Sequence, residues 1–371
     1  MSDKGNYQIS LFQYCVLMFI LSQPLFEGSG FVILFNKLGH QIIPSLILGA
    51  ILAISALFLI LYHINYEPDL NLFEKNRKLF GKIIGTILNV FVLIMTTIIL
   101  ATITSNLDAI AAIKYLPRTP YMLIGASFIF MAAYLAIKGI ETTVRSAEVF
   151  LIIMLLIDII MVPTTMFMVK IENFKPILFN NTMNIIQGAL LFLCYFLTPL
   201  SGLVIIPKNS IKNNEKFNKY FIITGIISII NIFIVTLLII GVVDINVVKD
   251  FRFSEFFIAK LIQLGTFFQN MEQFLSFYWV ISMFIYATIG MHFISQGAKL
   301  LFNIKKKTTN SIIIIVFSIV LPFLALFMFR STSDDLKFMK DYYPTIISLP
   351  VFIITIISCI FIFLKKKNKT I

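Results

Sequence analysis

Long apolar runs separated by short polar segments make up most of the chain. A helix needs roughly 20 apolar residues to cross a bilayer, and ten stretches are candidates. We therefore expect an all-α polytopic membrane protein that forms a single transmembrane domain over residues 1–371. The ten predicted spans are 9–38, 41–62, 80–106, 119–138, 144–169, 184–206, 219–242, 265–297, 310–330 and 344–364.

Two of these spans contain residues that disfavour a continuous helix. In the first span Pro24 removes a backbone donor, and Gly28 and Gly30 weaken helix propensity. Pro199 and Gly202 interrupt the sixth span in a similar way. Each proline could also be an ordinary kink in a packed helix. Irregular backbone is tolerated in a bilayer only where it is buried in protein or lines a cavity.

Paired interruptions at corresponding positions of two halves are typical of inverted-repeat transporters. We therefore predict a five-plus-five inverted repeat with broken helices 1 and 6. The predicted segments are repeat one at about 9–169, repeat two at about 184–330 and a last helix at about 344–364.

The two interruptions supply candidate ligand-binding groups. Half-helix N-termini would point positive dipole ends at an anionic group such as an amino acid carboxylate. The freed carbonyls would face an ammonium group or a cation. Hydroxyls of the third span would complete the cavity. The predicted ligand-binding residues are Gln23, Glu27, Gly28, Ser29, Gly30, Thr97, Tyr195, Thr198, Ser201 and Gly202.

Carboxylates at membrane depth are functional candidates by default. Glu27 either contacts a ligand or ion, or caps the second half-helix near Gly30. Asp158, in the middle of the fifth span, is a candidate ion or proton site, or a carboxyl group bonded to a neighbouring hydroxyl. Glu272 is a second candidate ion or proton site, or an interfacial partner for Lys260.

Three charged residues near the start of the fifth span suggest a structural role. Glu141, Arg145 and Glu148 are spaced at i, i+4 and i+7, which places them on one helix face. Glu141 and Arg145 can pair along that helix. We interpret the three as a structural clasp for the short connection between spans four and five.

Composition agrees with the membrane assignment, because 59% of residues are hydrophobic and 13% are charged, with mean hydropathy +0.94. Most of the 30 Lys and Arg fall in segments on the same side as both termini if the spans number ten. The positive-inside rule then places both termini in the cytoplasm. The clearest markers are Lys305–Lys307 and Lys365–Lys367. The net charge of +12 is therefore assigned to topology and not to a nucleic-acid partner.

The sequence gives little support for an enzyme. His40, His63 and His292 are isolated and lack metal-ligand spacing. The chain has no nucleotide-binding P-loop motif, and Gly28–Gly30 is not preceded by a strand as a dinucleotide fingerprint requires. We expect no catalysis, no metal and no cofactor.

Three segments carry a resemblance to a known family. Leu116–Pro120 reads Leu-Pro-Arg-Thr-Pro, and Gly139–Glu148 reads Gly-Ile-Glu-Thr-Thr-Val-Arg-Ser-Ala-Glu. These match the Leu-Pro-x-Thr-Pro and Gly-Ile-Glu-x-x-x-Arg-x-x-Glu patterns of the spore germination permease family. Phe268–Trp279 is similar to a third segment of that family, except that Asn270 stands in place of an arginine. The resemblance extends over essentially the whole chain.

This resemblance implies much that the residues alone do not. The family belongs to the amino acid–polyamine–organocation superfamily, which has the five-plus-five fold. Its members are B subunits of germinant receptors in the spore inner membrane of endospore-forming Firmicutes. They act with an A subunit and a lipoprotein C subunit and sense nutrients, commonly amino acids.

We therefore expect a germinant-sensing membrane subunit with its ligand between spans one and six. The alternatives are an ion-coupled amino acid secondary transporter and an interaction scaffold with a vestigial site.

Overall fold

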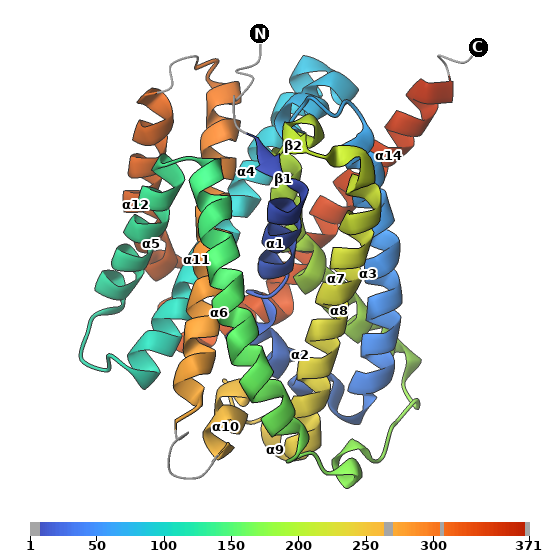
Figure 1. Ribbon diagram of the computed structural model, residues 1–371, viewed down its shortest axis with the longest axis vertical. Coiled ribbons are helices and arrows are strands. Elements are labelled where there is room, and N and C mark those ends of the chain that lie inside the picture. Colours follow the sequence, from blue (N-terminus) through green and yellow to red (C-terminus); the bar gives the residue numbers. More distant parts are fainter. Residues whose placement is uncertain (1–7, 263–269, 305–307, 368–371) are drawn as a thin grey trace.

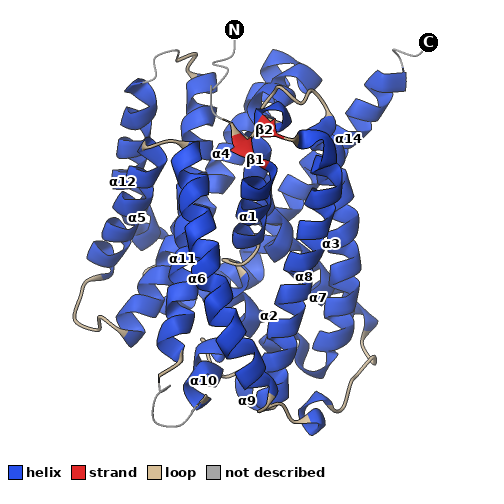
Figure 2. Cartoon of the chain, in the orientation of Figure 1, coloured by secondary structure: helices blue, strands red, loops and turns tan. Residues whose placement is uncertain are grey.

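The computed structural model is a bundle of helices with one very short strand pair (Figures 1 and 2). It describes residues 8–262, 270–304 and 308–367. Residues 265–269 of the predicted eighth span and the Lys305–Lys307 cluster lie outside the described residues.

The helices of the first half of the chain alternate with short connections. They are α1 (Leu11–Leu21), a π-helical turn (Phe26–Gly30), α2 (Phe31–Leu38), a 3-10 turn (Gly39–Gln41), α3 (Ile42–Asn65), α4 (Leu72–Lys114), α5 (Tyr121–Ile137), α6 (Ile140–Met166), a 3-10 turn (Ile171–Phe174) and α7 (Thr182–Leu200).

The second half begins with 3-10 turns at the end of α7. Its elements are 3-10 turns (Ser201–Ile205, Lys208–Ser210 and Asn214–Lys216), α8 (Phe217–Val242), α9 (Ile245–Val248), α10 (Ser254–Leu261), α11 (Glu272–Leu301), α12 (Thr308–Met328), α13 (Thr332–Lys337), a π-helical stretch (Phe338–Ser348) and α14 (Leu349–Lys367). The strands are β1 (Ile9–Ser10) and β2 (Ile211–Lys212).

Within the described residues, eight helices are long and apolar enough to cross a membrane. The prediction of an all-α polytopic membrane protein is confirmed at this level. The predicted spans 9–38 and 41–62 both fall in the stretch Leu11–Asn65, which descends through α1 and α2 and returns in α3 (Figure 1). The predicted span 119–138 corresponds to the shorter apolar helix Tyr121–Ile137.

The spans differ in how much surface they leave for lipid. α7 is the most buried of the candidate spans and α6 is the most exposed. α1 packs against α6, α8 and α11, so the first helix lies inside the bundle. The exposed side chains of α6 are large and apolar, as Ile152 and Ile159 illustrate. Such a surface suits a hydrocarbon environment.

α4 begins earlier than the predicted span 80–106 because its first turns are polar. Asn71 caps the helix, and its side chain accepts a hydrogen bond from the Glu74 N–H. Gly81 then adopts φ +81°, which kinks the backbone inside the helix. The Lys75 ammonium is buried and donates to the His63 and Ile64 carbonyls at the end of α3.

The N-terminal segment forms a short strand pair with a distant part of the chain. β1 pairs in parallel with β2, with Ile9 opposite Ile211. Both ends of the described chain lie at this end of the bundle (Figure 1).

The residues of the predicted clasp also contact this N-terminal segment. The Gln8 N–H donates to Glu141, and the Gln13 amide donates to Glu148. Arg145 is exposed and forms no ion pair with either glutamate among the described side chains. An exposed ion pair with Arg145 would in any case add little stability. Through their hydrogen bonds to Gln8 and Gln13, the two carboxylates hold α6 against the start of α1.

Candidate functional site

The connection between α1 and α2 is irregular and buried. α1 ends at Leu21, and Glu27 (φ −61°, ψ 131°) and Gly28 (φ +73°, ψ −41°) leave the helical region. Side chains disfavour this conformation of Gly28, so glycine is required there. Every residue from Ser22 to Gly30 is buried.

Side chains from distant helices bond the backbone groups that the irregular connection frees. The Asn106 amide, from α4, donates to the Glu27 carbonyl at 3.1 Å and accepts from the Ser29 hydroxyl at 2.9 Å. The Gly28 N–H donates to the Glu255 carboxylate of α10 at 3.3 Å. Because buried backbone groups need partners, these contacts hold the connection in its irregular form.

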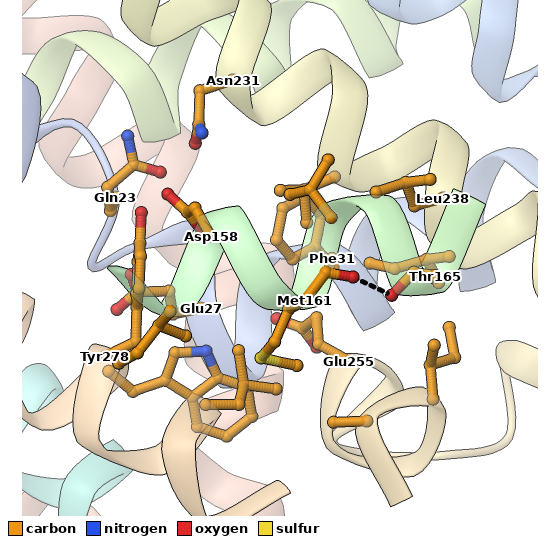
Figure 3. Close-up of a pocket in the computed structure, with 18 residues that line it drawn as sticks. Gln23, Glu27, Phe31, Asp158, Met161, Thr165, Asn231, Leu238, Glu255 and Tyr278 are labelled. Atoms are coloured by element: carbon orange, nitrogen blue, oxygen red, sulfur yellow. Dashed lines mark hydrogen bonds between the residues drawn. The ribbon is translucent and has the colours of Figure 1, made fainter. Parts of the chain in front are cut away.

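A cavity lies directly beside this connection (Figure 3). It contains about 710 Å³ of space, including its open mouth. The lining residues come from the connection, α2, α6, α8, α10 and α11. They are Gln23, Glu27, Phe31, Ile157, Asp158, Met161, Val162, Thr165, Asn231, Val235, Leu238, Ile239, Glu255, Ile258, Ala259, Leu275, Tyr278 and Trp279.

The cavity contains acidic but no basic side chains among its described lining residues. Glu27, Asp158 and Glu255 contribute three carboxyl groups, and no Lys, Arg or His is among the described lining residues. Glu27 is 4% exposed, and its Oε2 accepts from the Ser282 hydroxyl while its Oε1 has no partner in the described structure. The cavity therefore brings three carboxyl groups together without a basic partner among the described lining residues.

The cavity has a polar end and an apolar end. Figure 3 shows the polar ends of Gln23, Asp158 and Asn231 gathered together, while Phe31 and Leu238 lie further along. The Asn231 Oδ1 is buried and has no partner among the described atoms. Such unpaired buried groups are costly unless a ligand or water bonds them.

Glu255 belongs to a short helix outside the eight candidate spans. Burial raises the pKa of this carboxyl group to about 7, and hydrogen bonds from the Gly28 N–H and the Ser254 hydroxyl only partly oppose that shift. The same side chain therefore holds the connection and lines the cavity.

The structure brings only part of the predicted site to this cavity. Gln23, Glu27 and Asp158 line it. Gly28 and Ser29 lie in the same connection and bond to Glu255 and Asn106. Glu272 is also buried with one unpartnered oxygen, but it is not among the lining residues.

Three other predicted ligand-binding residues form hydrogen bonds within the helix bundle. The Thr97 and Ser201 hydroxyls donate to the Leu93 and Thr198 carbonyls of their own segments. The Tyr195 hydroxyl donates to the Met339 carbonyl.

The remaining three predicted residues also lie within the packed bundle. A side chain at Gly30 would collide with the Leu25 carbonyl oxygen. A side chain at Gly202 would meet Ile289 at an ordinary contact distance of 3.5 Å. The Thr198 hydroxyl donates to the Cys194 carbonyl. None of the residues in these two groups lines the cavity.

Sequence reasoning missed Asn106, Asn231, Glu255 and Tyr278. Asn231 is an isolated polar residue in an apolar span, and this signal could have identified it. Asn106 ends the predicted span 80–106 beside Ser105 and close to Asp108, so its polarity did not stand out. Glu255 gave no such signal because it lies in a segment between predicted spans.

Comparisons with known proteins agree with this membrane architecture. A family model described as spore germination protein matches residues 8–335. The chain is 23% identical to spore germination protein A2 of Bacillus subtilis (strain 168) over 303 residues, which cover 81% of this chain and 80% of that protein.

A second protein of that organism, YfkT, carries a provisional spore germination name. The chain is 22% identical to it over 260 residues, or 69% of this chain and 70% of YfkT. The resemblance found in the sequence is thus confirmed, and the chain belongs to the spore germination permease family.

Proposed function

We propose that the chain is the membrane subunit of a spore germinant receptor and binds a small-molecule germinant, an amino acid, in the cavity beside the α1–α2 connection. The observation that carries this proposal is a cavity in which buried Glu27 keeps an unpartnered oxygen. Membership of a spore germination family supports the same role.

The proposed membrane arrangement has ten crossings related by a five-plus-five inverted repeat. α1 with α2 forms the first crossing, α3 the second and α5 the fourth. The irregular α1–α2 connection and the 3-10 turn after α7 are the two interruptions. An even number of crossings agrees with both ends lying at one end of the bundle. Those ends face the cytoplasm, and the membrane is the spore inner membrane.

The proposed signal is a change in packing between the two halves. The lining residues Glu27 and Asp158 come from the first half, and Glu255 and Tyr278 come from the second. A ligand that contacts both halves favours the packing that it binds more tightly, and the bias equals its difference in affinity for the two packings. Partner subunits of the A type and the lipoprotein C type receive this bias.

A germination assay tests this role. Glu27→Gln removes the carboxylate at the cavity but keeps the side-chain volume. In spores that carry this variant, we expect the germinant concentration for half-maximal response to rise at least about tenfold, the value of one charge-assisted hydrogen bond. The level of the protein in the membrane should stay unchanged by immunoblot.

Asp108→Asn is the matched control. Asp108 is also buried with an unpartnered oxygen, but it faces a different, smaller pocket. We expect this variant to respond at wild-type concentrations. A normal dose–response in Glu27→Gln spores would show that the germinant does not bind at Glu27.

The alternative is an ion-coupled amino acid secondary transporter. The carboxyl groups of Glu27 and Asp158 favour it because they could carry protons. Liposomes that contain the purified chain distinguish the two roles. Saturable binding of a labelled amino acid without accumulation supports a sensor, whereas accumulation driven by an ion gradient supports a transporter.

A further inference from the structure

The carboxyl groups of the proposed germinant site have no basic partner among the described lining residues. Three of its lining residues are acidic, and none of the described lining residues is basic. Carboxylates repel one another and lose hydration when buried, so they need a cation or protons. Asp158 forms no hydrogen bond or ion pair with any described residue, and the Glu27 Oε1 has no partner there. Two acidic groups are therefore free to receive a ligand.

A carboxylate on the ligand would find no basic side chain among the described lining residues. The backbone N–H groups at the start of α2 are the natural anion donors of an interrupted helix. Here the Gly28 N–H donates to Glu255, the Phe31 N–H donates to the Phe26 carbonyl, and the Glu27 N–H donates to the Gln23 carbonyl. These donors are already occupied within the protein.

The rest of the cavity suits an apolar body. Beyond the polar end, the apolar side chains of Phe31, Met161 and Leu238 form much of the wall, together with Thr165. Transfer of an alkyl or aromatic group from water to such a wall is favourable. The polar end and the apolar wall together fit a ligand that has a charged group at one end and an apolar body.

We infer that the cavity selects an ammonium group carried on an apolar body, and that a carboxylate on the ligand is not required for binding. This inference rests on the proposed function, because it concerns the same cavity. The ammonium group donates to the carboxylates of Glu27 and Asp158. The Asn231 Oδ1 accepts a further hydrogen bond from it. The apolar body lies along Phe31 and Leu238.

Matched sets of probes test this inference with the full chain in lipid nanodiscs. One set is leucine, 3-methylbutylamine, N-acetylleucine and 4-methylpentanoic acid, and the other is phenylalanine with the equivalent derivatives. In at least one set we expect the amine to bind within about threefold of the amino acid. The N-acetyl and acid probes, which lack the ammonium group, should bind at least about tenfold more weakly.

The possible outcomes separate the inference from the proposed function. If the acid or N-acetyl probe binds as tightly as the amino acid, or if the amine fails where the amino acid binds, the inference is wrong and the proposed site stands. If no probe of either set binds, the inference and the proposed binding role both fail.

Two variants test whether the amine binds at the carboxylates of the cavity. Asp158→Asn should weaken amine binding at least about tenfold, because it removes one charged acceptor. Asp108→Asn should change it less than about twofold, because Asp108 faces the other pocket. Equal affinities in the two variants would overturn the assignment of the ammonium site. Thermal unfolding of each variant shows whether it is folded.

Discussion

The α1–α2 connection and the end of α7 have similar sequences but different structures. Both contain proline, glycine and a hydroxyl residue. The connection leaves the helical region at Glu27 and Gly28, whereas α7 continues through Pro199 and passes into a 3-10 turn at Ser201. Proline alone is therefore compatible with a continuous helix in this chain.

The partners of the backbone explain the difference. At the connection, Asn106 and Glu255 reach in from α4 and α10 to bond the freed carbonyl and N–H groups. At α7, the Thr198 and Ser201 hydroxyls bond carbonyls of their own helix. An irregular backbone is thus stabilised by distant side chains, while local hydroxyls support a nearly regular helix.

Removal of a distant partner should have the largest effect. Asn106→Ala leaves the Glu27 carbonyl and the Ser29 hydroxyl without a partner, and we expect a loss of about 4 kcal/mol in the free energy of unfolding, from two groups at about 2 kcal/mol each. Ser201→Ala, which removes one local bond, should cost less than about 1 kcal/mol. Unfolding in detergent measures both, and similar losses would contradict the contrast between the two regions.

A pH series should give the next largest effect, because the connection depends on a titratable group. The pKa of Glu255 is raised from 4.5 to about 7 by burial. Between these values the folded protein keeps a proton that the unfolded chain releases. The contribution of Glu255 to stability is therefore greatest below pH 4.5 and falls as the pH rises to about 7.

Glu255→Gln should flatten this dependence. Glutamine cannot titrate but keeps an oxygen to accept from the Gly28 N–H. We expect wild type to lose up to about 3 kcal/mol relative to this variant between pH 4.5 and 7. Unfolding of both proteins across this range measures the difference. The exposed control Glu215→Gln should keep the wild-type dependence of the unfolding free energy on pH. The same pH dependence in all three proteins would show that Glu255 does not cause it.

A pair of glycine substitutions should give the smallest effect. Gly28→Ala places a side chain at φ +73° and 3.2 Å from the Asn106 amide, which should cost about 1–2 kcal/mol. Gly202→Ala has an ordinary contact to Ile289 and should change the free energy by less than about 0.5 kcal/mol. If both variants unfold at the same temperature in detergent, the two glycines are equivalent and the contrast is lost.

Sequence reasoning reached the membrane class and the family because both depend on long patterns. It also singled out Glu27 and Asp158, since a carboxylate in an apolar run is conspicuous. It could not show that Glu255 would join them, because packing brings α10 to α6 across a long separation in the chain. Nor could it separate Ser201 from Ser29, because a hydroxyl that bonds its own helix and one that bonds a distant asparagine have the same sequence signal.

The pairing of β1 with β2 constrains the order in which the protein can be assembled. β1 precedes α1, and β2 follows α7. During synthesis the first helix therefore enters the membrane long before its strand partner has left the ribosome. Before that point, Glu141 and Glu148 of α6 are already available to bond the Gln8 N–H and the Gln13 amide. The strand pair can therefore form only after α1 to α7 have been synthesised, so it closes a contact between the two halves late in assembly.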